Sequence, residues 1–178
     1  MELDQAIKNR RSIRKFLKKE VERDKIKKLI EAAQYAPSWK NKQVSKYYVI
    51  DTPEIKEKFL EKCLYNFNHK NMVDAPVIIA CTVVDGVIGV KNGEYETPIK
   101  DGYQYFDNGL QVQNLCLKAY EMGLGTLIMG LYDFCRTRTF FNIPNNEKLT
   151  VLIGVGYPDI NPDMPPRKRL DEILKFYN

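Results

Sequence analysis

Histidine and clustered cysteine are the residues that this sequence most clearly lacks. His69 is the only histidine, which excludes metal sites and catalytic triads that need several imidazole groups. The four cysteines, Cys63, Cys81, Cys116 and Cys135, are widely spaced and form no Cys-x-x-Cys pair, so neither a structural zinc site nor a thiol-redox motif is expected. Cys81 and Cys116 stand within apolar segments, where cysteine behaves as a small core residue.

Long apolar runs and targeting signals are also missing. No uninterrupted apolar stretch approaches the roughly 20 residues that span a bilayer, and the acids Glu2 and Asp4 stand where a signal peptide would be basic. These features predict a cytoplasmic protein with no membrane partner. The net charge of +5 is mild, and the sequence has no basic patch with interleaved aromatic residues, so we expect no nucleic-acid partner.

Length and composition are those of one globular domain. A chain of 178 residues can bury its own core, and 44% hydrophobic with 29% charged residues is typical of a soluble protein. The sequence contains no internal repeat, low-complexity tract or linker, so residues 1–178 are predicted to form a single domain.

Two clusters of positive charge are the most informative feature that is present. They are Arg10-Arg11-Ser12-Ile13-Arg14 near the start and Arg167-Lys168-Arg169 near the end. In an extended chain Arg10, Ser12 and Arg14 point the same way, and in a helix Arg10 and Arg14 are one turn apart. In both cases guanidinium groups converge in a way that suits a phosphate, although a solvated surface run explains the same spacing.

Hydrophobic periodicity predicts helices and strands in one fold. Apolar residues recur at helical spacing from Ile26 to Ala33, which predicts a helix over 24–35 that Pro37 ends. The apolar run from Pro76 to Val84 predicts a strand buried on both faces. The helix expected over 103–122 is apolar on more than one side, which is typical of a helix at the centre of a fold. Other helices are expected over 3–9, over 53–64 and within 130–149, other strands over 47–50, 126–129 and 150–157, an irregular excursion over 85–100, and a final segment over 170–176.

Five segments carry a more specific signal when they are taken together. They are Arg10-Arg11-Ser12-Ile13-Arg14, the loop Ala33 to Gln43 with its Ala-Pro-Ser-x-x-Asn-x-Gln pattern, Asp74 to Ile79, Asp107 to Gly130 with Gly123-Leu124-Gly125-Thr126, and Gly154-Val155-Gly156-Tyr157-Pro158 followed by Pro166-Arg167-Lys168-Arg169. In this order, and over nearly the whole chain, they resemble the nitroreductase family of FMN enzymes. Each motif alone is weak, but five in register form a specific pattern.

The resemblance implies roles for residues at both ends of the chain. The FMN phosphate would be held by Arg10, Ser12, Arg167 and Arg169. Arg14 would lie nearer the ribityl chain and the pyrimidine edge of the ring, where a cation favours reduction of the flavin. Arg11 would belong to this site less directly, as a surface residue or a partner-subunit contact.

The resemblance also implies contacts with the flavin ring. The loop with Pro37, Ser38, Trp39 and Asn41 would reach the flavin of the other subunit. Asn68 would pair with the N3 and O4 edge, because an amide offers both a donor and an acceptor; the alternative is an ordinary turn residue. The segment Leu127, Ile128, Met129 and Gly130 would pack against the ring and donate backbone hydrogen bonds near N5, and it also reads as the buried end of a strand.

The fold and function implied by the resemblance are specific. We expect an α+β fold, a nitroreductase-like three-layer α-β-α sandwich with a central mixed sheet flanked by helices, in an intertwined homodimer. The implied function is an FMN-dependent oxidoreductase that moves hydride from NADH or NADPH through the flavin to a nitroaromatic or quinone in a ping-pong cycle. No side chain would act as a nucleophile and no metal is expected. Gly86, Gly89 and Gly93 lack the Gly-x-Gly-x-x-Gly spacing, so no separate dinucleotide domain is predicted.

Two departures from the family pattern leave alternatives open. Val44-Ser45 replaces the usual Pro-Trp after the loop, and the excursion between Val84 and Tyr103, where the family builds much of its substrate-facing lid, is short. Substrate choice is therefore the least defined property. The alternatives are a reductive dehalogenase or flavin-destroying enzyme of the same family, or a flavin-binding or storage protein without turnover.

Overall fold

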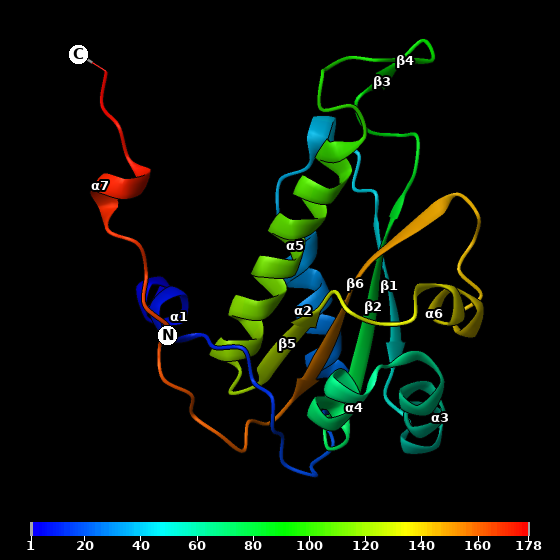
Figure 1. The fold of residues 1–178 in the computed structure, drawn as a ribbon, viewed down its shortest axis with the longest axis vertical. Helices are drawn as coiled ribbons and strands as arrows, with labels where there is room; N and C mark the ends of the chain where they lie inside the picture. Colours follow the sequence, from blue (N-terminus) through cyan, green and yellow to red (C-terminus); the bar gives the residue numbers. More distant parts are fainter. Residues whose placement is uncertain (1, 178) are drawn as a thin grey trace.

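An apolar strand lies inside the central sheet. The computed structural model describes residues 2–177, and its main sheet has the strand order β1–β2–β6–β5 (Figure 1). These strands are β1 (Ser45–Ile50), β2 (Val77–Val84), β6 (Glu147–Gly156) and β5 (Gly125–Met129). β2 lies between β1 and β6, and every residue from 77 to 83 is buried. The prediction of a strand buried on both faces is confirmed.

Helices cover both faces of this sheet (Figure 1). α2 (Arg23–Gln34) and α5 (Gly102–Glu121) form one outer layer, and α3 (Pro53–Cys63) and α4 (Asn66–Met72) form the other. Because side chains alternate along β2, Ile79 belongs to the hydrophobic cluster of the first layer and Ile78 to that of the second. The predicted α+β sandwich of three layers is therefore confirmed.

The direction of the strands differs from the expected mixed sheet. All three neighbouring pairs, β1–β2, β2–β6 and β5–β6, are antiparallel. β1 and β2 are joined through α3 and α4, and β5 and β6 are joined through α6 (Phe134–Phe140). Each of these connections brings the chain back into the sheet at the end where the preceding strand finished. The next strand must then run the opposite way. Among residues 2–177, the parallel pairing is an isolated bridge between Ser12 and Thr126.

The shorter elements depart from the sequence prediction in two places. α4 was not expected, because its asparagines and histidine have weak helix propensity; burial of Met72, which is 0% exposed, anchors it instead. The excursion over 85–100 contains a two-stranded hairpin, β3 (Val90–Lys91) with β4 (Glu94–Tyr95). The remaining elements are α1 (Leu3–Asn9), the 3₁₀ turn η1 (Trp39–Asn41) and α7 (Leu170–Ile173).

The segment after β6 leaves the body of the fold. Figure 1 shows it passing α1 and carrying α7 away from the sheet. None of residues 158–177 is buried, and Leu170, Ile173 and Phe176 are all exposed apolar side chains. Within residues 2–177, no helix combines the length and the apolar character needed to cross a membrane.

Candidate functional site

The first basic cluster runs as an extended segment beside the edge strand β5. Ser12 forms the parallel bridge with Thr126, and the Ile13 N–H donates to the Thr126 carbonyl at 2.9 Å. The approach is close, because a Cβ atom at Gly125 would lie 2.5 Å from Ile13 Cγ1. Ile13 is buried in the core, whereas Ser12 is half-buried and Arg14 is exposed. Of the two geometries considered from the sequence, the chain adopts the extended one.

Arg10 is the member of this cluster with unused hydrogen-bonding capacity. Its side chain is half-buried, and its Nε is a buried donor that has no hydrogen-bond partner among residues 2–177. Burial raises the pKa of the Cys116 thiol on α5, and the Thr126 side chain and the charge of Arg10 lower that pKa in part. An unpartnered buried donor is costly, which favours an anionic partner at this point.

Arg11 and Arg14 have different surroundings. Arg11 donates to the carbonyls of Lys8, at 2.7 Å, and Arg10, at 2.9 Å, and so satisfies backbone acceptors at the end of α1. Arg14 makes one long contact, 3.4 Å to the Ser12 carbonyl, and its guanidinium is otherwise free to meet a ligand.

The second basic cluster lies on the exposed tail. Arg167 donates to the Pro165 carbonyl at 3.1 Å, and Arg169 pairs with Asp171 at 2.5 Å at the start of α7. No hydrogen bond or ion pair within residues 2–177 joins these arginines to Arg10, Ser12 or Arg14. The tail before the second cluster passes close to the first one, because Asn9 and Arg11 line a recess of about 300 Å³ together with residues 161–164.

The predicted flavin loop contacts the beginning of α5. Trp39 N–H donates to the Asp107 carboxylate at 2.7 Å, and the Trp39 and Tyr103 rings lie 4.5 Å apart. Lys40 pairs with Glu96 at 2.7 Å. Pro37 and Asn41 are exposed, and Ser38 and Trp39 are half-buried.

Asn68 and the end of β5 are joined directly. The Asn68 side chain is buried and its Nδ2 donates to the Leu131 carbonyl at 2.7 Å. Leu127 and Met129 are buried, whereas Ile128 is 45% exposed and Gly130 is exposed. A recess of about 360 Å³ includes Ile128 and is lined by residues of α5 and of strand β6. Asn68 thus positions the segment that follows β5, and its Oδ1 is not used in that contact.

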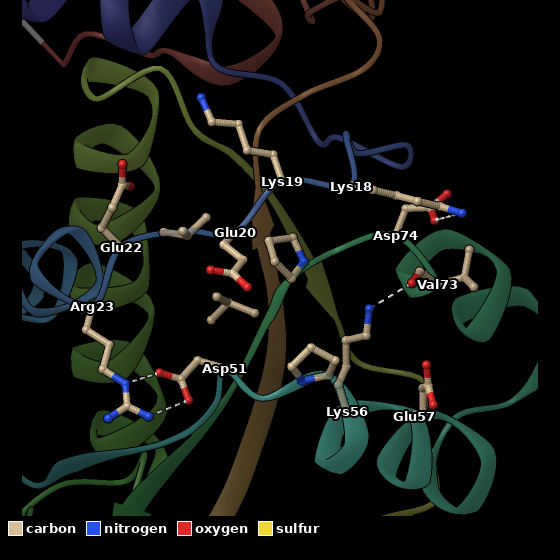
Figure 2. Close-up of a pocket in the computed structure, with 14 residues that line it drawn as sticks. Lys18, Lys19, Glu20, Glu22, Arg23, Asp51, Lys56, Glu57, Val73 and Asp74 are labelled. Carbon is tan, nitrogen blue, oxygen red and sulfur yellow. Dashed lines mark hydrogen bonds and ion pairs between the residues drawn. The ribbon is translucent and has the colours of Figure 1, made fainter.

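A separate cavity of about 610 Å³ contains none of the predicted residues. It lies near the starts of α2 and α3 (Figure 2). Part of its charge is paired from within: Arg23 pairs with Asp51, Lys18 with Asp74 at 3.6 Å, and Lys56 donates to the Val73 carbonyl at 2.8 Å (Figure 2). The Arg23 hydrogen bond lowers the pKa of Asp51, and burial lowers the pKa of Lys56. This internal pairing gives no reason to place the predicted chemistry here.

A polar stripe on α5 was missed from the sequence. Gln104, Asp107, Asn108 and Gln111 are all buried, although this helix was expected to be apolar on more than one side. Their spacing of i, i+3, i+4 and i+7 is a signal for one helix face. Asn108 donates to Ser45 Oγ at 3.0 Å and Gln111 accepts from the Tyr47 hydroxyl at 2.8 Å, so the stripe holds β1 while Asp107 holds the loop before it.

Comparison with known proteins gives consistent matches. The family model described as "Nitroreductase family" matches residues 7–157. A protein of Methanothermobacter thermautotrophicus, named as an NADH dehydrogenase or NAD(P)H nitroreductase, is 31% identical over 91% of this chain and 80% of its own. Iodotyrosine deiodinase 1 of Sus scrofa is 27% identical over 97% of this chain and 68% of its own. In structure, a nitroreductase family protein of Streptococcus pneumoniae superposes with a TM-score of 0.86 at 23% identity, covering 99% of this chain and 100% of its own.

Proposed function

The chain belongs to the nitroreductase family, and we propose that it is an FMN-dependent oxidoreductase that takes hydride from NADH or NADPH and reduces a small acceptor such as a nitroaromatic or a quinone. Members of this family use flavin and NAD(P)H. We propose that residues 1–178 act as one FMN-binding domain.

The buried, unpartnered Nε of Arg10 is the observation that supports a phosphate-bearing cofactor best. Next to it, Ser12 is held against β5, and the exposed Arg14 has only one long contact. Together these residues offer two cations and a hydroxyl along one extended segment, which fits the donors that a phosphate dianion accepts. The residues present therefore fit FMN.

The remaining predicted residues complete the proposed site. Arg10 and Ser12 would hold the phosphate, with Arg167 and Arg169 as further donors, and Arg11 would stay at the end of α1. Arg14 would place positive charge toward the pyrimidine edge. Asn68 and the segment Leu127, Ile128, Met129 and Gly130 would orient the ring, and Pro37, Ser38, Trp39 and Asn41 would close the site from a second chain.

The chemistry divides between the cofactor and the chain. When bound, FMN supplies the centre that accepts and returns hydride. The side chains bind it, orient it and adjust the charge around it, so no nucleophile or metal ligand is required of them. Among residues 2–177, no group of three His, Cys, Asp or Glu side chains is arranged to hold a metal ion.

We further propose that the working unit is a homodimer. By resemblance to the family, the loop with Pro37, Ser38, Trp39 and Asn41 would reach the flavin held by the second copy, so each site would need both chains. The tail after Pro158 exposes apolar side chains, including Leu170 and Phe176, which suits an arm laid on a partner.

Reduction of bound flavin tests the proposed function. The purified protein should be yellow and should release FMN when denatured. In stopped-flow mixing with NADH or NADPH, the flavin absorbance should bleach within seconds and return when a nitroaromatic or quinone is added. A yellow protein that is not bleached by either nicotinamide would instead be a flavin-binding or storage protein, and a protein that binds no FMN would refute the proposal.

A reductive dehalogenase is the second candidate, and the similarity to iodotyrosine deiodinase 1 favours it over other variants. The two activities differ in their products. A halotyrosine offered to the reduced protein should release halide if the chain is a dehalogenase, and no halide if it reduces only nitroaromatics or quinones.

A further inference from the structure

The loop from Ser38 to Gln43 has a conformation that its own residues do not favour. Lys40, Asn41 and Gln43 have φ angles of +47°, +57° and +51°, in the left-handed region that side chains with a Cβ atom rarely adopt. Three such residues within four positions persist only when the surroundings hold them. The question is which contacts do so.

The loop is held both by its own hydrogen bonds and by contacts from the rest of the fold. Inside the loop, the Asn41 N–H donates to the Ser38 carbonyl and the Lys42 N–H to the Trp39 carbonyl, both at 3.0 Å, and Gln43 donates to Ser38 Oγ at 3.2 Å and to Asn41 Oδ1 at 3.0 Å. From outside, Asp107 on α5 accepts the Trp39 N–H at 2.7 Å, and the Tyr103 ring lies 4.5 Å from the Trp39 ring. Glu96, just after β4, pairs with Lys40 at 2.7 Å. The outside contacts are the ones that fix the loop relative to α5.

Asp107 differs from the other anchors in its burial. The Tyr103 ring is only partly buried, and the ammonium group in the Lys40–Glu96 pair is half in solvent, with 56% of the lysine side chain exposed. Asp107 is 3% exposed, and burial raises its pKa because the charged carboxylate has lost water. A buried carboxylate that accepts a backbone N–H is a strong, geometrically defined contact. Its protein partner is the backbone of Trp39, inside the loop.

We infer that Asp107 is a positioning residue that fixes the Ser38–Gln43 loop on α5 in the conformation needed at the flavin, with Lys40, Asn41 and Gln43 left-handed. The anchoring itself is independent of any cofactor, and the flavin consequence rests on the proposed function. Asp107 does not need to touch the flavin in this role. It acts through Trp39, which it sets in register with the start of α5.

The single tryptophan makes the inference testable, because all tryptophan emission of this protein comes from the loop. In FMN-free Asp107→Ala, Trp39 emission should shift to the red and acrylamide should quench it more strongly. FMN should bind about tenfold more weakly, the loss expected for one hydrogen bond to a charged group. Asp107→Asn keeps an acceptor oxygen and should leave both properties close to those of the wild type.

Asn114→Ala is the matched control. Asn114 is on the same helix and donates to the Ala32 carbonyl at 3.2 Å on α2, not to the loop. It should lower thermal stability without changing Trp39 emission or FMN affinity. A merely structural role for Asp107 predicts that both alanine variants behave alike.

The outcomes separate cleanly. Unchanged Trp39 emission and quenching in Asp107→Ala would overturn the anchor, and loosened Trp39 with unchanged FMN affinity would overturn the positioning role. If wild type binds no FMN, the proposed function fails and the Trp39 measurements alone decide the anchor. If Asp107→Ala does not fold, hydrogen exchange in wild type decides it: the Trp39 amide should be protected, and exchange as fast as that of the exposed loop amides would overturn the inference.

Discussion

Replacing Arg10 should weaken FMN binding without lowering the stability of the FMN-free protein. Arg10→Met keeps an unbranched apolar chain as far as the position of Nε but removes the guanidinium charge and the buried Nε donor, which has no partner among residues 2–177. An unsatisfied buried donor costs about 1–3 kcal/mol, so the FMN-free variant should unfold at the same or a higher urea concentration than wild type. Loss of a charge-assisted contact to phosphate should weaken FMN binding by about 1.5–3 kcal/mol, or roughly 10- to 150-fold.

Urea unfolding with and without FMN measures both effects in one experiment. At an FMN concentration about 100 times the wild-type Kd, binding adds about 2.7 kcal/mol to the free energy of unfolding of wild type. For a variant that binds about 100-fold more weakly, the same concentration adds only about 0.4 kcal/mol.

A matched control is Arg23→Met, which removes an arginine paired with Asp51 beside the unrelated large cavity. It should keep the full increment from FMN. The reasoning is refuted if Arg10→Met clearly destabilises the FMN-free protein, or if its FMN increment equals that of wild type.

Three further predictions concern the flavin potential, alkaline stability and assembly. Arg14→Gln should lower the midpoint potential of bound FMN, by roughly 30 mV for each 1.4 kcal/mol of differential stabilisation lost; equal potentials by potentiometry would exclude a tuning role. Burial raises the pKa of Tyr132 to about 12, above the value of about 10 expected in the unfolded chain. The contribution of the neutral Tyr132 hydroxyl to the free energy of unfolding is therefore fully present below pH 10. It is lost as the pH rises through 12, by about 2.7 kcal/mol in all. Tyr132→Phe loses the hydrogen bond to the Thr150 carbonyl, yet above pH 10 its free energy of unfolding should fall less steeply than that of wild type. The free energy of unfolding measured with urea at each pH tests this, and parallel curves for the two proteins would contradict it. Sedimentation of the flavin-loaded protein should give twice the chain mass of 20.8 kDa, and a monomer that retains its flavin would refute the dimer.

The local pattern of apolar residues in the sequence was sufficient to predict most of the helices and strands. The apolar run of β2 and the helical spacing in α2 appear in the structure within about one residue of the predicted limits. These segments bury side chains on a period that the backbone geometry imposes, so the periodicity is visible without knowledge of the partner. The order of the family motifs identified the fold as well, because it covers nearly the whole chain.

The direction of the strands could not be obtained in the same way. Pairing of β2 with both β1 and β6 joins segments far apart in the chain, and no local pattern states whether neighbours run parallel or antiparallel. α4 was missed for a related reason. Its residues have weak helix propensity, and the helix is stabilised by burying Met72 and Asn68 against the rest of the fold.

In the candidate site too, some features were predictable from the sequence and others depended on the tertiary structure. Residue types and spacing predicted that Arg10, Ser12 and Arg14 suit a phosphate, with a solvated surface run as the alternative. Only the tertiary structure placed that segment against β5, left the Arg10 Nε without a partner and paired Asp107 with the backbone of Trp39. An isolated aspartate on a helix carries no sign of the loop it holds, because the contact spans 68 residues and depends on burial that arises only when α5 packs on the sheet.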